Sequence, residues 1–401
     1  MKISELKEII KKGGVDYAFR DLYKDVSAGR KRALALCENF LDKFGDMEDA
    51  AFFSAPARME LIGNHTDHNG GLAVGAAIDR DILALAAPFD DVVMIYEGES
   101  FTEAKLDGEA EKGSSAALAA GMARRFGGGF CACTDSLIPV GKGLSSSAAF
   151  ALLCGKIADS FYGGNATAME LALAAKMTEN EDFGKKCGLL DQICCAFGGA
   201  VHIDFKTPIP AVSPVEYNVG DMGIFLVDTR VSHAGADSKY GQIAEDMERA
   251  AEYFGARRLA DVPAELFAEK KEHLRLKLGD RVYRRAIHFF DENKRVGFFC
   301  RRAALGQLPV CLYAVNGSGI SSRTNLCNVH TEANDATEAL KDIAAAIRIH
   351  GGGFGGSIQC YVPKDKTEAF TKKMEELFGA GCVIPAKIRS RGVCRLDYEQ
   401  A

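Results

Sequence analysis

The sequence has no long run of basic residues, and its net charge at neutral pH is -6. A chain of this charge without a basic stretch binds nucleic acid or an anionic membrane surface poorly, so we expect neither partner. The sequence also has no uninterrupted apolar segment of membrane-spanning length. Its most apolar long stretch, residues 71–88, contains Asp79, Arg80 and Asp81, so no transmembrane helix is expected.

The cysteines do not have the spacing of a zinc site or of a disulfide framework. There are 13 of them, without paired CxxC motifs, and most lie inside apolar stretches. Free thiols in this number favour a reducing compartment, so we expect a cytoplasmic protein. The N-terminal segment MKISELKEIIKKGG is polar and amphipathic, and we do not expect it to be a secretory signal.

The length of 401 residues favours two domains, and a proline-bearing stretch at residues 206–221 predicts domains of residues 1–210 and 211–401. Helices are predicted at residues 30–44, 114–126, 148–162, 167–180, 245–254, 280–295 and 332–349. Strands are predicted at residues 51–53, 72–85, 92–96, 130–138, 223–228 and 357–362, with loops at 54–71 and 351–356. Thr167 and Glu170 have the spacing of a capping box. Alternating helices and strands indicate an α+β or α/β fold, of which we expect α+β.

The segment PVGKGLSSSAA, residues 139–149, combines glycines with the start of a predicted helix. Gly141 and Gly143 allow a tight backbone curl close to a ligand, and a helix N-terminus favours an anion. The serines at 145–147 add hydroxyl donors and one possible Mg²⁺ ligand. The segment does not satisfy the Walker A pattern. Composition alone leaves a phosphate loop and an ordinary glycine turn with a serine N-cap equally open.

The segment SAPARMELIGNHTDHNGG, residues 54–71, is dense in polar side chains, among them Arg58, Asn64, His65, Asp67 and His68. A ligand rich in hydroxyls needs such a cluster, because each hydroxyl both donates and accepts. The alternatives are a surface Asx turn and a metal site, and no further ligand spacing supports the metal site.

Asp191 follows Leu189 and Leu190 and precedes Ile193, so a carboxylate stands among apolar residues. Burying it is costly unless it is paired, and beside a cation such as Arg58 it would stay ionised and accept a hydroxyl proton. The alternative is a helix-capping aspartate. The segment GGGFGG at 351–356 contains GxGxxG, but the expected order of helix, glycines and strand is the reverse of a dinucleotide site.

These segments resemble the motifs of the GHMP kinases, and of galactokinases in particular. Residues 139–149 are similar to the motif PxGxGLSSSAA, residues 54–71 to APGRxNLIGEHTDYNxG, residues 187–192 to CGxMDQ, and residues 351–356 to GxGFGG. The resemblance spans about residues 50 to 362 and includes DRVYRRAIHFFDENKRV. Ala57, Asn64 and His68 depart from the sugar signature, where the family has Gly, Glu and Tyr.

The resemblance implies an N-terminal domain like domain 2 of ribosomal protein S5, a ferredoxin-like C-terminal domain, and ATP-dependent phosphorylation of the anomeric hydroxyl of galactose. It implies ATP contacts from Gly141, Gly143, Leu144, Ser145, Ser146 and Ser147, and Mg²⁺ held by Ser146 and Glu179. It implies Asp191 as base with Arg58 at the transferred phosphate, and sugar contacts from Asn64, His65, Asp67, Gly188 and Tyr240. The alternatives are a kinase for galacturonate or N-acetylgalactosamine and a non-catalytic sugar and ATP sensor. A monomer or weak homo-oligomer is expected.

Overall fold

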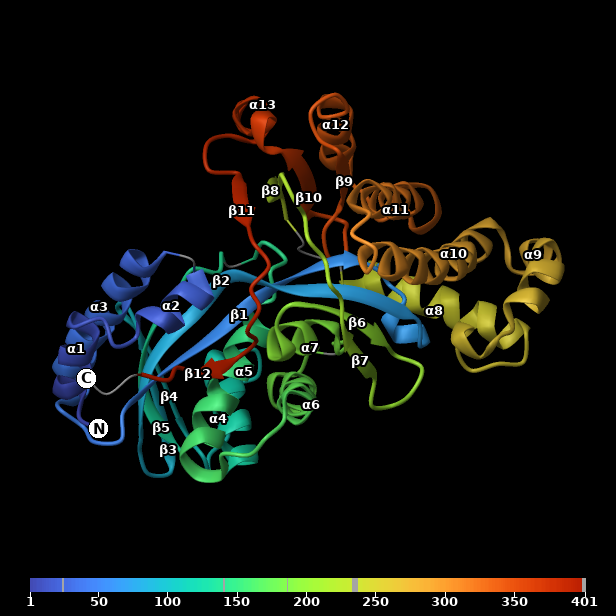
Figure 1. Ribbon diagram of the computed structural model, residues 1–401. Helices are drawn as coiled ribbons and strands as arrows, with labels where there is room; N and C mark the ends of the chain where they lie inside the picture. The colour runs from blue at the N-terminus through green and yellow to red at the C-terminus, as the bar shows by residue number, and fades with distance from the viewer. Residues whose placement is uncertain (24, 140, 186, 233–236, 399–401) are drawn as a thin grey trace.

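The computed structural model describes residues 1–23, 25–139, 141–185, 187–232 and 237–398, and it contains two β-sheets with helices on their faces (Figure 1). The larger sheet is formed by β1 (Ala51–Ile62), β2 (Leu72–Pro88), β3 (Val92–Glu97), β4 (Ser100–Lys105), β5 (Phe130–Ser136), β6 (Ala200–Asp204), β7 (Ala211–Pro214) and β12 (Cys394–Arg395). Its order is β12-β1-β2-β5-β3-β4, with β6 joining β2 to β7. The smaller sheet has the order β11-β8-β10-β9, from β8 (Met222–Val231), β9 (Ala346–Ile349), β10 (Gly356–Pro363) and β11 (Val383–Ala386).

Helices cover both faces of the larger sheet, and the strand period of two decides which residue faces which layer. On β1, Phe52 packs with α1 (Ile3–Lys11), α2 (Asp16–Tyr23) and α3 (Val26–Phe44), whereas its neighbour Phe53 packs with the opposite layer. That opposite layer contains α4 (Ser115–Phe126), α5 (Ser146–Ala158), α6 (Ala168–Thr178) and α7 (Leu190–Phe197).

The smaller sheet shows the same alternation. Phe225 and Val227 of β8 pack with α12 (Thr331–Ala339) and α13 (Thr367–Phe378), whereas Ile224 and Leu226 face the core shared with the larger sheet. The remaining helices are α8 (Asp237–Tyr253), α9 (Ala264–Leu278), α10 (Asp280–Ala303) and α11 (Leu308–Ser321). Within the described residues, no helix is both long and apolar enough to cross a bilayer.

The α+β class is confirmed, and the predicted helices at 30–44, 114–126 and 167–180 are present as α3, α4 and α6. The capping box at the start of α6 is also confirmed, because Thr167 Oγ1 accepts from Glu170 N at 3.2 Å and Glu170 Oε2 accepts from Thr167 N at 2.8 Å.

Two element predictions were wrong. The strand expected at residues 51–53 continues to Ile62, because its polar residues Ser54, Arg58 and Glu60 are buried and its backbone pairs with β2. The helix expected at residues 332–349 ends at Ala339, and residues 346–349 form β9 against β10. The glycines at 351–356 therefore join two antiparallel strands, and we call residues 350–356 the glycine hairpin.

The division after residue 210 remains a proposal. The strand just beyond it, β7, still pairs with the larger sheet, and β12 near the C-terminus returns to that sheet. Between them, β8 to β11 form a sheet of their own, so we propose that the C-terminal half builds a second domain and sends its last strand back to the first.

A fully buried carboxylate joins the N-terminal helices and the C-terminal segment to the larger sheet. Asp81 of β2 accepts hydrogen bonds from Tyr23 Oη at 2.6 Å, Arg32 Nη1 at 2.9 Å and Arg389 Nη1 at 3.2 Å, and another from Ser54 Oγ. Burial alone would raise the pKa of Asp81, but the two guanidinium groups outweigh it and the pKa is lowered. The charge at this position therefore holds three distant segments together.

We predict that Asp81→Asn lowers the free energy of unfolding by about 3–5 kcal/mol, because it leaves the buried Arg389 without its counter-ion. Equilibrium denaturation in urea measures the change. Glu8→Gln, which breaks the exposed pair of Glu8 with Lys11, is the control and should leave the denaturation midpoint unchanged. Equal effects of the two substitutions would contradict the role given to Asp81.

Candidate active site

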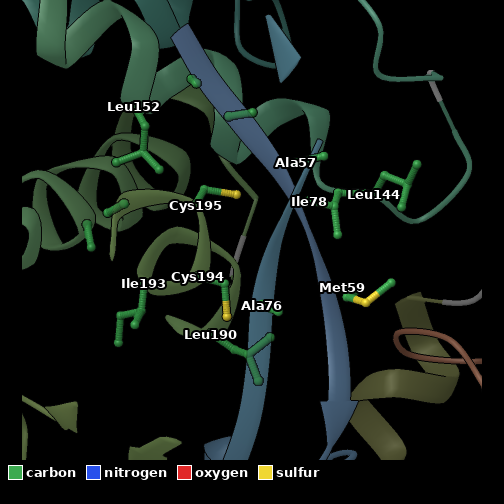
Figure 2. Packing of buried hydrophobic residues seen from close by; sticks show 14 of the residues in the cluster. Ala57, Met59, Ala76, Ile78, Leu144, Leu152, Leu190, Ile193, Cys194 and Cys195 are labelled. Atoms are coloured by element: carbon green, nitrogen blue, oxygen red, sulfur yellow. The ribbon is translucent and has the colours of Figure 1, made fainter. Parts of the chain in front are cut away.

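The glycine and serine segment forms a loop that leads directly into α5. Gly141 and Gly143 have φ of 74° and 73°, a left-handed conformation that glycine adopts without strain. Ser145 precedes the helix at φ 59°, and Ser146 is the first helical residue. Leu144 buries its side chain in the core (Figure 2), so a ligand contact from Leu144 would come from its backbone. The loop thus presents a helix N-terminus, which favours an anion.

Arg58 and Asp191 form a bidentate ion pair beside this loop. Arg58 Nε donates to Asp191 Oδ1 at 2.6 Å and Arg58 Nη2 donates to Asp191 Oδ2 at 2.8 Å. Arg58 Nη1 donates to the carbonyl of Gly143 at 2.6 Å, and Ser145 Oγ donates to Asp191 Oδ2. The structure therefore brings together four of the predicted site residues from β1, the loop and α7.

The protonation state of Asp191 follows from these contacts. Burial would raise its pKa, but the charge of Arg58 and the hydrogen bonds from Arg58 and Ser145 lower it below the ordinary carboxyl value. Asp191 is therefore ionised at neutral pH, and its carboxylate accepts hydrogen bonds.

The packing of α7 fixes the position of Asp191. Leu190, Ile193 and Cys194 lie under the crossing strands β1 and β2 (Figure 2). On β2, a Cβ atom added at Gly75 would lie 2.3 Å from the sulfur of Cys194, so glycine is required for this close approach. Because the apolar face of α7 points into the core, Asp191 in its first turn faces Arg58.

We call residues 63–71, which follow β1, the sugar loop, and its candidate residues lie next to one another. His65 has φ 56°, and its Nε2 contacts the carbonyl of Gly352 in the glycine hairpin at 2.9 Å. Tyr240 of α8 lies with its ring centroid 6.1 Å from that of His65 and donates to the carbonyl of Gly353 at 3.0 Å. Tyr240 is therefore part of the same cluster.

Gly188 lies directly against Asp67. A Cβ atom at Gly188 would lie 2.3 Å from Asp67 Oδ2, so any side chain there would collide with the carboxylate. His68 lies on the same short turn, and its buried Nε2 has no hydrogen-bond partner among the described residues. The structure thus joins the predicted residues of the sugar loop to the segment that precedes α7.

Asn64 is buried, and the protein itself uses all of its hydrogen-bonding capacity. Its Nδ2 donates to the carbonyl of Gly351 at 2.7 Å and to Glu60 Oε1 at 3.2 Å. Its Oδ1 accepts from Asn328 Nδ2 at 3.0 Å and from Ser322 Oγ at 3.4 Å. Asn64 therefore connects the sugar loop to the glycine hairpin and to the segment after α11.

Sequence analysis missed Glu60 and Arg348. Arg348 of β9 is fully buried, donates from Nη1 to the carbonyl of Glu60 at 2.9 Å, and pairs with Glu60 Oε1 through Nη2. A signal was available in the signature APGRxNLIGEHTDYNxG, which has Asn where this chain has Glu60 and Glu where it has Asn64. The two residue types are exchanged, and in the structure they touch each other.

Helix α10 binds the backbone of the sugar loop through two buried side chains. Glu292 is fully buried and accepts from Gly63 N at 3.0 Å, and His288 Nε2 donates to the carbonyl of Asn64 at 2.8 Å. Burial lowers the pKa of His288 to about 4, so its ring is neutral at neutral pH. The segment DRVYRRAIHFFDENKRV, residues 280–296, thus supports Gly63 and Asn64 in the first half of the chain.

Glu179 is the candidate metal carboxylate. It is buried at the end of α6, and its Oε2 accepts from Gln192 Nε2 at 3.0 Å. Its Oε1 is buried with no hydrogen-bond partner among the described residues. Among those residues, no group of three or more His, Cys, Asp or Glu side chains lies together in a way that could hold a metal ion. A metal at Glu179 would therefore need further ligands such as a serine hydroxyl, phosphate oxygens or water.

Comparisons with known proteins agree with this arrangement. Residues 38–88 match the galactokinase galactose-binding signature, and residues 115–199 match the GHMP kinases N terminal domain. A galactokinase of Streptococcus suis is 31% identical over 368 residues, which is 86% of this chain and 92% of the relative. A galactokinase of Lactococcus lactis subsp. lactis is 29% identical over 390 residues, which is 91% of this chain and 97% of the relative.

A solved structure is similar along almost the whole chain. The crystal structure of Lactococcus lactis galactokinase complexed with galactose gives a TM-score of 0.80 at 27% identity and covers 89% of this chain and 98% of its own. The expected GHMP kinase fold is confirmed by this likeness and by the family model of the N-terminal domain.

The buried histidines predict how stability depends on pH. Burial lowers the pKa of His68 and of His288 to about 4, whereas both titrate near 6.5 in an unfolded chain. Between these values the unfolded state binds protons that the folded state does not, so stability falls as the pH decreases. We predict that the free energy of unfolding drops by roughly 1 kcal/mol per pH unit per histidine between pH 6.5 and 4.5.

Urea denaturation at several pH values measures this slope. His288→Gln should reduce the slope, since it removes one of the groups that titrate only on unfolding. His273→Gln, at an exposed position on α9, is the matched control and should leave the slope unchanged. A wild-type stability that is constant from pH 6.5 to 4.5 would contradict the prediction.

Proposed function

Because this chain belongs to the galactokinase family of GHMP kinases, we propose that it transfers the γ-phosphoryl group of ATP to the anomeric hydroxyl of galactose. The observation that carries the proposal is the ionised Asp191, held by Arg58 between the phosphate loop and the sugar loop. The relative of known structure was solved in complex with galactose, which supports the choice of sugar.

The phosphates of ATP would bind at the N-terminus of α5. Gly141 and Gly143 let the backbone curl around them, and the N–H groups and hydroxyls of residues 144–147 supply donors. Arg58 is a fixed cation beside the loop, because it donates to the carbonyl of Gly143. We propose that it stabilises the negative charge on the phosphoryl group in transfer.

Ser146 and Glu179 would hold Mg²⁺. The buried Glu179 Oε1 without a partner among the described residues fits this role, since a buried carboxylate oxygen needs a cation or a donor. Mg²⁺ commonly takes one or two protein ligands and completes its shell with substrate phosphates and water. When bound, it would neutralise the charge of the β- and γ-phosphates.

His65, Asp67, Gly188 and Tyr240 would bind the sugar. The carboxylate of Asp67 can accept from two neighbouring hydroxyl groups, and Gly188 leaves the space beside it free of a side chain. Asn64 has no hydrogen-bonding group to spare, so we propose that it holds His65 in place and does not itself bind the sugar.

In the chemical step, the anomeric oxygen forms a bond to the γ-phosphorus of ATP while the bond from that phosphorus to the β,γ-bridging oxygen breaks. The proton of the anomeric hydroxyl passes to the carboxylate of Asp191. Since the pKa of Asp191 is lowered, it is a weak base, and its main work is to orient the hydroxyl and to take the proton late in the reaction.

We also propose a cytoplasmic location, because all 13 cysteines are free thiols. A monomer or weak homo-oligomer stays a prediction.

A sugar panel tests the proposed function. With ATP and Mg²⁺, galactose should give a kcat/KM at least about tenfold above glucose, galacturonate and N-acetylgalactosamine, because an epimerised or bulky group leaves polar groups of the site unpaired. A coupled assay of ADP release measures this, and chelating Mg²⁺ should abolish it. Preference for the uronic acid or the amino sugar would overturn galactose as the substrate but would leave the proposed kinase activity intact. No ADP release with any sugar, together with sugar binding, would indicate a sensor.

Asp191→Asn tests the mechanism. The substitution is nearly isosteric but removes the proton acceptor, so kcat should fall by at least about 100-fold. The control is Asp16→Asn, which breaks a second bidentate pair, that of Asp16 with Arg30 among the N-terminal helices, and should keep kcat. Normal turnover with reduced thermal stability in Asp191→Asn would make the residue structural.

A further inference from the structure

Asp228 and Ser357, a pair of facing residues in the smaller sheet, both contact Lys142 of the phosphate loop. Lys142 lies between Gly141 and Gly143, and its Nζ is 2.7 Å from Asp228 Oδ2 on β8. The backbone carbonyl of Lys142 accepts from Ser357 Oγ on β10 at 3.0 Å. Asp228 and Ser357 are opposite each other in the pairing of β8 with β10. The side chain and the backbone of Lys142 are thus held by two partners that are themselves fixed side by side.

The anchor for Lys142 is rigid and charged. Asp228 is almost fully buried, and it accepts from Arg230 N at 3.0 Å and from Arg230 Nη1 at 2.7 Å. Arg230 in turn donates to the carbonyls of Phe378 and Ala380. Burial raises the pKa of Asp228, but the hydrogen bonds from Lys142 and Arg230 outweigh it and lower that pKa. Asp228 therefore stays ionised and fixed.

The phosphate loop needs such an anchor. Its two glycines give it a conformation that other residues avoid, but glycine also loses the most backbone freedom on ordering. Arg58 on the larger sheet binds Gly143. Asp228 and Ser357 on the smaller sheet bind the preceding residue, Lys142. Ser357 directly follows Gly356, the last residue of the glycine hairpin. The pairing of β8 with β10 shifts register between these two residues.

We propose that Lys142, Asp228 and Ser357 form a clamp that sets the position of the phosphate loop relative to the glycine hairpin, and hence of the ATP phosphates relative to Arg58 and Asp191. The three are positioning residues. The proposal rests on the proposed function for its kinetic consequence, whereas the clamp itself is a property of the folded chain.

The other role open to Lys142 is a direct contact with phosphate. The two roles make opposite predictions for Asp228. If Lys142 binds phosphate, Asp228 competes for its ammonium group, and Asp228→Asn should leave the KM for ATP unchanged or lower it. If the clamp operates, Asp228→Asn should do the same damage as Lys142→Met.

The experiment is a double-mutant cycle. Lys142→Met and Asp228→Asn should each raise the KM for ATP about fivefold, the size expected for one partly buried charge pair, and the double variant should be no worse than either. The KM for galactose should stay within about twofold. Ser357→Ala removes only the backbone contact and should raise the KM for ATP in the same direction, which keeps the test valid if Asp228→Asn does not fold.

A matched control lies at the other end of the same two strands. Lys364 and Asp221 form an exposed pair 3.0 Å apart, and Lys364→Met and Asp221→Asn should change neither KM. Added salt should reduce the difference in the KM for ATP between wild type and Lys142→Met, because salt screens the ion pair of Lys142 with Asp228.

Hydrogen–deuterium exchange without ligand separates the clamp from the proposed function. Amides of residues 141–147 should exchange about fivefold faster in Lys142→Met and in Asp228→Asn than in wild type, whether or not the wild type phosphorylates any sugar. If these amides exchange faster in both variants and the wild type phosphorylates no sugar, the clamp stands and the proposed function is overturned. Unchanged exchange, or a KM for ATP that rises only in Lys142→Met, would overturn the clamp.

Discussion

The ion pair of Arg58 and Asp191 is the constraint on which the site depends. Arg58 is buried and Asp191 is partly buried, and charges taken out of water are costly unless their geometry is good. The bidentate contact, with further hydrogen bonds to Gly143 and from Ser145, meets that condition only if β1, α7 and the phosphate loop keep their relative positions. The apolar cluster under β1 and β2, with Cys194 against Gly75, supplies this rigidity (Figure 2).

At the site, buried polar contacts join the larger sheet and its loop to the C-terminal half of the chain. Arg348 pairs with Glu60, Asn64 binds the carbonyl of Gly351, and Glu292 binds the amide of Gly63. Buried polar groups of this kind add little net stability compared with an apolar core, but they tolerate only one register, because each misplacement leaves a donor or acceptor unpaired. The loops that would surround the sugar and the phosphates are therefore fixed at one separation, which phosphoryl transfer requires.

Sequence alone predicted the parts of the site whose chemistry is local. A carboxylate between Leu190 and Ile193 is costly to bury unpaired, and Arg58 was named as a cation that could pair with it. Two glycines before a helix that begins with serines left a phosphate loop and an ordinary turn open, and the family resemblance favoured the phosphate loop. Contacts across the sheets were not predictable, since Asn64 meets Gly351 at a separation of 287 residues. Buried polar residues made most of β1 look like a loop. Residues 346–349 continue a helical spacing of apolar side chains, and only pairing with β10 makes them a strand.

Glu60 and Arg348 explain the departure of Asn64 from the signature in terms of packing. With a carboxylate at position 60, a second one at position 64 would lie within reach of it, because Asn64 Nδ2 is 3.2 Å from Glu60 Oε1. It would also place an acceptor opposite the carbonyl of Gly351, where a donor is needed. An amide meets both demands, since it donates twice and still accepts from Asn328. The contacts with Glu60 and the glycine hairpin thus account for the residue at position 64, and we propose that His65 and Asp67 select the sugar.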